Sequence, residues 1–301
     1  MNINYSKIFY SSEKRKIAFV GAMLFLMLFP AWIKGESTDS LAGAGSSRPV
    51  TGIYSFEIGR TDVLATYLSP LHYTGAQYGV TGEWSKAMPF NPESAVMHFD
   101  GGLNFCSLLN PAHTARMLGF TGDFRWGMSW KTTLPYQLTL TAGGSVGLNG
   151  GAYYLMRNSN NPVQAMAQAA LSLRGSIARP FTIGRLPILV RDVVSIPTVS
   201  AFFAPQYGET YYEIYLGNHS GLAHAGWWGN NFCIDNRLTV ALDFGRTAMT
   251  LGYHFQAQTQ WANHLNTKIF THSFIIGIVP GGLGLKPKAK KADRPTVYSL
   301  F

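Results

Sequence analysis

The stretch FTGDFRWGMSW, residues 120–130, alternates apolar and polar side chains one by one. One set is apolar or glycine: Phe120, Gly122, Phe124, Trp126, Met128 and Trp130. The intervening set, continued to residue 131, is polar or glycine: Thr121, Asp123, Arg125, Gly127, Ser129 and Lys131. Because successive side chains of a β-strand point to opposite faces, the pattern predicts a strand with one apolar face and one charged face.

The same period recurs along the chain, in Tyr54–Ile58, Gln77–Trp84, Met97–Phe105, Leu138–Asn149, Ala165–Arg174, Leu238–Phe244 and Met249–Gln256. Clusters typical of turns lie between them, such as Tyr67–Leu71 and Asn158–Pro162. Counting Glu209–Leu216, Phe181–Phe203 and a last strand that ends near Val279, we expect about ten to twelve strands. The assignment of Phe181–Phe203 stays open, because a central strand resists the prolines at 187 and 197.

Two all-β architectures bury such ribbons, a soluble sandwich and a transmembrane barrel. Crossing an outer membrane takes about 9–11 residues per strand, whereas strands in globular proteins cluster near five or six. The longer segments here reach the membrane length, and aromatic residues fall toward strand ends: Tyr54, Phe56, Tyr78, Trp84, Trp126 and Trp130. The sequence therefore predicts a single antiparallel transmembrane β-barrel. The alternative is a secreted soluble β-sandwich or lipocalin-like binder.

The first 35 residues place Lys14, Arg15 and Lys16 ahead of the uncharged apolar run Ile17–Phe29. This layout is typical of a cleaved signal peptide and leads us to expect export to the outer membrane. We divide the chain into a signal peptide (1–35), a linker (36–48), a barrel domain (49–280) and a basic tail (281–301).

The net charge of +9 is concentrated at the two ends of the chain. Residues 1–35 carry five bases and one acid, and the tail from Lys286 onward carries the same numbers, so each end contributes +4 and the rest about +1. No basic face remains that could follow a phosphate backbone, so nucleic acid is not an expected partner.

The polar faces of the predicted strands carry acids and bases that would point into a barrel lumen: Glu57, Glu83, Asp100, Asp123, Arg125 and Arg174. Buried charges are tolerated when they are paired or hydrated, so we expect an ion-pair network inside a narrow or plugged lumen. The histidine and cysteine spacings match no metal motif, and we expect no metal, no cofactor and no catalytic residue. Cys106 and Cys233 are expected to be separate, buried thiols.

Residues 206–231, QYGETYYEIYLGNHSGLAHAGWWGNN, gather aromatic rings that suit the level of lipid headgroups. We expect contacts there with outer-membrane lipid, lipopolysaccharide or glycan. The alternative is a lipid hydrolase that uses His219 and Ser220. Neighbouring side chains of a strand point to opposite faces, so this pair can react only within a loop.

Several motifs follow one another in the same order as in a known family. They are Asp62–Leu71 with Tyr73 and Gly75, Tyr154–Pro162, Pro205–Ile214 with Leu216–Asn218, and Thr271–Gly277. Over residues 52–279 the chain resembles a family of exported Bacteroidota proteins that is catalogued only as a domain of unknown function. The resemblance implies an outer-membrane location and supplies no catalytic residues.

Overall fold

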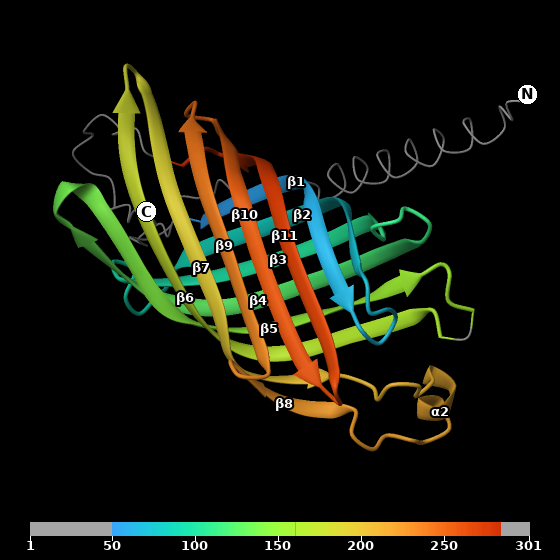
Figure 1. Cartoon of the computed structure of the whole chain (residues 1–301). Helices are drawn as coiled ribbons and strands as arrows, with labels where there is room; N and C mark the ends of the chain where they lie inside the picture. The colour runs from blue at the N-terminus through green and yellow to red at the C-terminus, as the bar shows by residue number, and fades with distance from the viewer. Residues whose placement is uncertain (1–49, 160, 284–301) are drawn as a thin grey trace, which may run out of the picture. The chain divides into compact units, whose positions relative to one another are not determined.

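The alternating stretch 120–130 lies within β4 (Arg116–Leu134), one strand of an antiparallel barrel (Figure 1). The structure is a computed structural model that describes residues 50–159 and 161–283. The other strands are β1 (Val50–Ala65), β2 (His72–Ala87), β3 (Ala95–Leu109), β5 (Leu138–Leu155), β6 (Val163–Ile183), β7 (Leu186–Phe203), β8 (Ala223–Trp227), β9 (Asn231–Asp243), β10 (Thr247–Ala262) and β11 (Leu265–Pro280).

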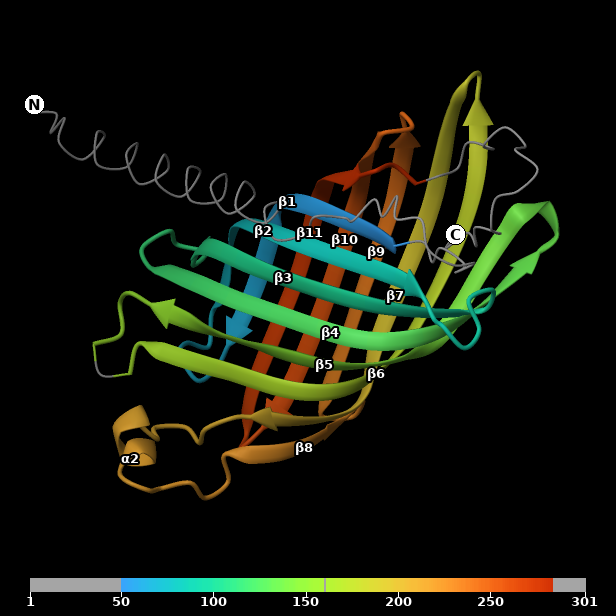
Figure 2. The same ribbon diagram turned by 180° about the vertical axis from the view of Figure 1, so that it is seen from behind.

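Ten of the strands form a closed ring, because β1 pairs with β11 and β6 pairs with β7. The eleventh, β8, pairs with the end of β7. A path through paired residues that leaves β7 at Ile188 passes once around the ring and returns to β7 at Ala201. This stagger tilts the strands against the barrel axis. Figures 1 and 2 show the tilt on the two opposite walls.

The barrel has its apolar side chains outside and many of its polar side chains inside. Phe120 is 57% exposed on the outer wall, while Asp123 and Arg125 point into the lumen. The predicted barrel is confirmed, and the sandwich alternative is wrong, because no second sheet covers this outer face in the described residues. The pattern is also opposite to that of a soluble barrel, whose interior would hold the apolar side chains.

The two ends of the barrel differ in their connections. At the turn end, β6 and β7 are joined through residues 184–185, β9 and β10 through 244–246, and both Val50 and Pro280 lie there. At the loop end, residues 204–222 join β7 to β8 and contain the helix α2 (Tyr211–Tyr215). Figure 1 shows α2 next to β8 at this end.

The prediction of a strand at Glu209–Leu216 is wrong, because the segment contains α2. A reciprocal capping box starts the helix: the backbone N–H of Glu213 donates to Thr210 Oγ1, and the backbone N–H of Thr210 donates to Glu213 Oε2. These two bonds satisfy backbone groups that a strand ladder would otherwise have to pair. The aromatic composition of the segment favours a strand, and the capping box overrides it.

The open segment Phe181–Phe203 resolves into the end of β6 and the whole of β7. Pro187 is the second residue of β7, and Pro197 lies where β7 changes partner. The ladder with β9 ends at Ser195, the ladder with β8 begins at Val199, and the pairing with β6 is irregular at the same level. Proline is tolerated at such an interruption.

The structure also shows which side chains of the last strand, β11, face the lumen and which face outward. Phe274 and Ile276 point outward, while Ile275 is buried in the lumen wall.

No described helix is long and apolar enough to cross a membrane. The signal peptide, the linker up to residue 48 and the basic tail from residue 284 lie outside the described residues, so these assignments stay predictions.

Candidate functional site in the barrel lumen

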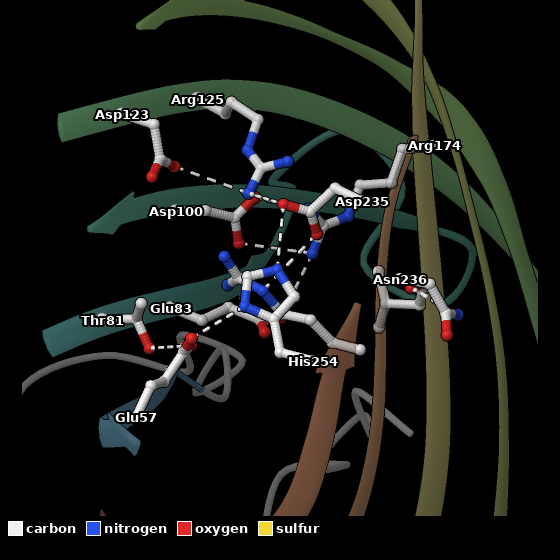
Figure 3. A network of polar contacts seen from close by, with 12 residues as sticks. Glu57, Thr81, Glu83, Asp100, Asp123, Arg125, Arg174, Asp235, Asn236 and His254 are labelled. Carbon is white, nitrogen blue, oxygen red and sulfur yellow. Dashed lines mark hydrogen bonds and ion pairs between the residues drawn. The ribbon is translucent and has the colours of Figure 1, made fainter. Parts of the chain in front are cut away.

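Charged side chains from eight strands meet in the middle of the lumen (Figure 3). We define this charge belt as Glu57, Glu83, Asp100, Asp123, Asp235, Arg125, Arg174, Arg191, Arg237 and His254. It contains all six charged residues that the alternation predicted to face the lumen, and their predicted ion pairing is confirmed. The other four come from β7, β9 and β10 and were not predicted as part of the network.

Three arginines of the belt reach across the lumen to strands that are not their neighbours. Arg125 on β4 donates to Asp235 on β9 at 3.2 Å. Arg174 on β6 donates to Asp100 on β3. A third contact runs from Arg191 on β7 to Glu83 on β2, at 2.5 Å. The paired strands are three to five places apart in the ring, so these side chains reach across the lumen.

A histidine of the belt contacts two of its acids. His254 Nδ1 lies 2.8 Å from Glu57 Oε2, and its Nε2 lies 3.3 Å from Asp235 Oδ2. Asp235 therefore contacts both Arg125 and His254. Buried ions repay their desolvation only when several partners surround them, and this arrangement supplies those partners.

Glycines in the wall make room for the belt. A Cβ added at Gly147 would lie 2.9 Å from Cγ of Arg125, and one at Gly127 would lie 2.6 Å from Nε2 of His98. Other buried polar atoms, Arg125 Nε and Thr250 Oγ1 among them, have no hydrogen-bond partner among the described residues. Buried polar atoms of this kind are ordinarily satisfied by water.

A cavity of about 70 Å³ lies in the lumen beside the belt residue Asp123. Its lining is rich in uncharged amide side chains: Gln77, Asn104, Asn149, Gln168, Gln256, Gln258 and Gln260. Some of these amides already bond one another, as Gln77 donates to Asn104 at 2.7 Å. The cavity is polar and large enough for several water molecules.

An apolar cluster, the apolar cap, lies in the lumen at the loop end. We define it as the buried side chains Val63, Ala65, Tyr67, Leu68, Tyr73, Cys106, Leu108, Ala115, Met117, Tyr153, Leu155 and Ile269. Tyr67 Oη donates to the backbone oxygen of Glu209 at 2.7 Å, which fastens the 204–222 connection to the cap. The ring of Tyr211 packs edge-on against Tyr67, and its hydroxyl accepts from the backbone N–H of Ala165 at 2.6 Å.

Burial keeps these two phenols protonated. Burial raises the pKa of Tyr67 above its ordinary value, and it raises the pKa of Tyr211 to about 12. The hydroxyl of Tyr67 therefore remains a donor across the physiological range.

The predicted aromatic rim lies at the loop end. Tyr207, Tyr212 and Tyr215 are 77%, 68% and 82% exposed. Trp228 lies beside β8 and donates from Nε1 to the backbone oxygen of Pro197 at 2.7 Å. The tyrosine rings of the rim thus lie on the 204–222 connection, which a hydrogen bond from Tyr67 attaches to the cap.

His219 and Ser220 lie in an exposed turn that follows α2. Within the described residues no hydrogen bond joins them, whereas Asn218 donates to Glu209 Oε1 at 2.9 Å. The turn therefore gives no support to a His–Ser nucleophile. Among the described residues no group of three potential ligands could hold a metal ion. Cys106 and Cys233 are both free and buried, as predicted.

A family model described as "Protein of unknown function (DUF3316)" matches residues 22–289 of the chain. No curated protein sequence matches it. Among solved structures, the chain is similar to the outer membrane protease OmpT from Escherichia coli, with a TM-score of 0.42, 8% identity and coverage of 81% of this chain and 99% of that one.

Two autotransporter domains show a comparable similarity. For the transport unit of AIDA-I from Escherichia coli the TM-score is 0.40 at 7% identity, over 83% of this chain and 93% of that one. For the beta domain of the Bordetella autotransporter BrkA it is 0.37 at 11% identity, over 77% and 100% of the two chains.

Proposed function

We propose that this chain, which belongs to the DUF3316 family of proteins of unknown function, is an outer-membrane barrel with a closed lumen. It displays the 204–222 connection at the cell surface. The role is structural or adhesive, and no bond-making chemistry is expected. The observation that carries the proposal is the set of ion pairs that cross the lumen between strands that are not neighbours.

The outer wall supports a membrane location. Large apolar side chains cover it and are each between 38% and 59% exposed: Ile58, Leu103, Phe124, Val146, Leu148, Leu171, Leu173, Phe274 and Ile276. A continuous apolar surface of this extent is unusual for a protein in water and suits lipid tails. The ring strands have 13 to 21 residues, more than the roughly 9–11 that cross an outer membrane.

The connections support an orientation. Outer-membrane barrels have an even number of strands, short turns on the periplasmic side and longer loops outside. Ten strands close this barrel, and both ends of the barrel region lie with the short turns. We therefore place the turn end in the periplasm and the loop end at the cell surface. The leader predicts the export that this placement needs, and the sequence resemblance predicts an origin in Bacteroidota.

The lumen argues against passage of solutes. A molecule entering from the loop end meets the apolar cap, and one entering from the turn end meets the belt. Desolvated ion pairs are costly to separate, so the belt is not a gate that opens with thermal motion. The amide-lined cavity is the one feature that favours small-solute passage, and conductance decides between the two roles.

The decisive measurement is conductance of the full chain in planar lipid bilayers, with a general porin reconstituted in parallel. We expect the chain to require detergent for extraction, to migrate on gels in a heat-modifiable way and to give no steady conductance. Single-channel steps in the wild-type chain would show an open lumen and contradict the proposal. A monodisperse mature chain in detergent-free buffer would contradict the membrane location.

The displayed rim requires its own test. Tyr207, Tyr212 and Tyr215 give aromatic faces on which sugar rings can stack, so we expect glycan or lipopolysaccharide to bind there. Binding of the solubilised chain to a glycan array should weaken in the triple variant Y207A/Y212A/Y215A. The matched control is Tyr136→Ala, a tyrosine that is 84% exposed in the short 3-10 turn Pro135–Gln137 between β4 and β5. Equal loss in both variants would exclude the rim as the binding surface.

A further inference from the structure

Four polar side chains stand side by side on the outer wall, on four consecutive strands of the ring. They are Tyr253 on β10, His272 on β11, Arg60 on β1 and Thr74 on β2. His272 and Arg60 are direct partners in the ladder between β11 and β1. Side chains of such a pair lie close together on one face of the sheet, so these two side chains can contact the same group of a bound ligand.

Each member of the central pair is held by its outer neighbour. Arg60 donates from Nη2 to Thr74 Oγ1 at 3.2 Å. The hydroxyl of Tyr253 contacts His272 Nδ1, and the ring of Phe255 lies 5.0 Å from the histidine ring. When the phenol is the donor in this contact, Nδ1 accepts and the ring proton lies on Nε2. Two oriented donors therefore face outward from adjacent strands.

The row lies at the edge of the apolar band. Ile58 and Phe274 lie two residues closer to the turn end on β1 and β11, and Tyr78 lies four residues closer on β2; all three are exposed and largely apolar. On the loop-end side the outer wall adds charged groups beside apolar ones such as Phe270: Lys268 on β11, and the pair formed by Asp62 and His72, in which His72 Nδ1 lies 2.7 Å from Asp62 Oδ1. In a membrane this boundary is the level of the lipid headgroups.

We infer that Arg60 and His272 bind the phosphate group of an outer-leaflet glycolipid, whose acyl chains lie along the apolar wall below. The inference rests on the proposed membrane location. Guanidinium binds phosphate through two parallel charge-assisted hydrogen bonds, and the imidazole Nε2–H adds a third donor. The carboxylate of Asp62 is engaged by His72, which lowers its repulsion of the anion.

Native mass spectrometry of the detergent-solubilised full chain tests this site, with lipid A and its dephosphorylated form as probes. We expect the wild type to bind the phosphorylated form about tenfold more tightly, as charge-assisted hydrogen bonds imply. R60Q/H272Q should lose this preference, and Arg60→Lys, which keeps the charge without the fork, should lose part of it. Heat-modifiable migration establishes that each variant is folded.

Arg179 supplies the matched control, because it is an exposed arginine of β6 that lies near the turn end. The preference should survive Arg179→Gln. An unchanged preference in R60Q/H272Q, or an equal loss in Arg179→Gln, overturns the inference. Full displacement of the lipid by inorganic phosphate would reveal a free-anion site and also overturn it. The wild type could need detergent and give no conductance, yet bind both forms of lipid A equally. That result would overturn the lipid site and leave the proposed function standing.

Discussion

The charge belt and the apolar cap occupy one lumen and use the same strands, yet their chemistry is opposite. β1 contributes Glu57 to the belt and Val63 to the cap, and β3 contributes Asp100 to the belt and Leu108 to the cap. All four side chains are almost completely buried. The comparison shows that facing the lumen does not by itself decide whether a residue is polar.

The neighbours account for the difference. At the belt, the inward side chains meet charged side chains from other strands and form ion pairs with them. At the loop end, inward side chains meet one another and the chain segments around Tyr67 and Tyr211, so a conventional apolar core forms. The belt should therefore be sensitive to loss of one charge, and the cap to loss of volume.

Removing one arginine of the belt should have the largest effect. Arg174→Leu leaves Asp100 without its arginine and takes one of two from Glu83, so we expect a loss of about 4 kcal/mol in the free energy of unfolding. Urea unfolding of the vesicle-reconstituted chain measures it. Arg179→Leu, on the outer wall, should change the value by no more than about 0.5 kcal/mol. Equal stability of the two variants would mean that the belt is dispensable.

Truncating one side chain of the cap should cost somewhat less. Leu108 is fully buried, and Leu108→Ala should lower the free energy of unfolding by about 3 kcal/mol through lost burial and a new cavity. The comparison is Leu148→Ala, which changes an outer-wall leucine that is 59% exposed. The same urea titration applies, and a smaller loss at Leu108 than at Leu148 would argue against a packed cap.

Loosening the attachment of the 204–222 connection should have a local effect. Tyr67→Phe removes the hydrogen bond to the backbone oxygen of Glu209 and should cost about 1 kcal/mol. Amide hydrogen exchange in residues 204–222 should then speed up about fivefold, while exchange in the ring strands stays unchanged. Tyr136→Phe is the control and should leave exchange in the connection as it is.

Acid should weaken α2 by the smallest amount. Hydrogen bonds from the backbone and hydroxyl of Thr210 hold the pKa of Glu213 below its ordinary value of 4.5. A carboxylate whose pKa is lower in the folded state stabilises it above the unfolded pKa, and this contribution is lost as the pH falls through the folded value. Exchange of the amides of Tyr211–Tyr215, corrected for intrinsic rates, should rise in acid. In Glu213→Gln this pH dependence should be absent.

The faces of the strands could be predicted from the sequence, because alternation assigns Asp123 and Arg125 to one side without any knowledge of the fold. The capping box at Thr210 and Glu213 was also present as a local signal, and giving it more weight than aromatic composition would have predicted α2. The same alternation through Cys233, Asp235 and Arg237 marks a lumen face on β9 that sequence reasoning did not use.

The partners across the lumen could not be predicted in this way. Arg125 meets Asp235 because the ring closes with a particular stagger, which depends on the pairing of all ten strands. Likewise, Leu108 shares the parity of Asp100, and only the segments at the loop end explain why an apolar residue is stable there.

The ladder between β1 and β11 joins residues about two hundred positions apart in the chain. Until β11 arrives, the edges of β1 and β10 present unpaired backbone groups, which invite pairing with other chains. Closure of the ring therefore requires β11. A chain truncated before Leu265 would form an open sheet whose exposed edges can pair with other chains. The strand β11 is therefore as necessary to this protein as any residue inside the barrel.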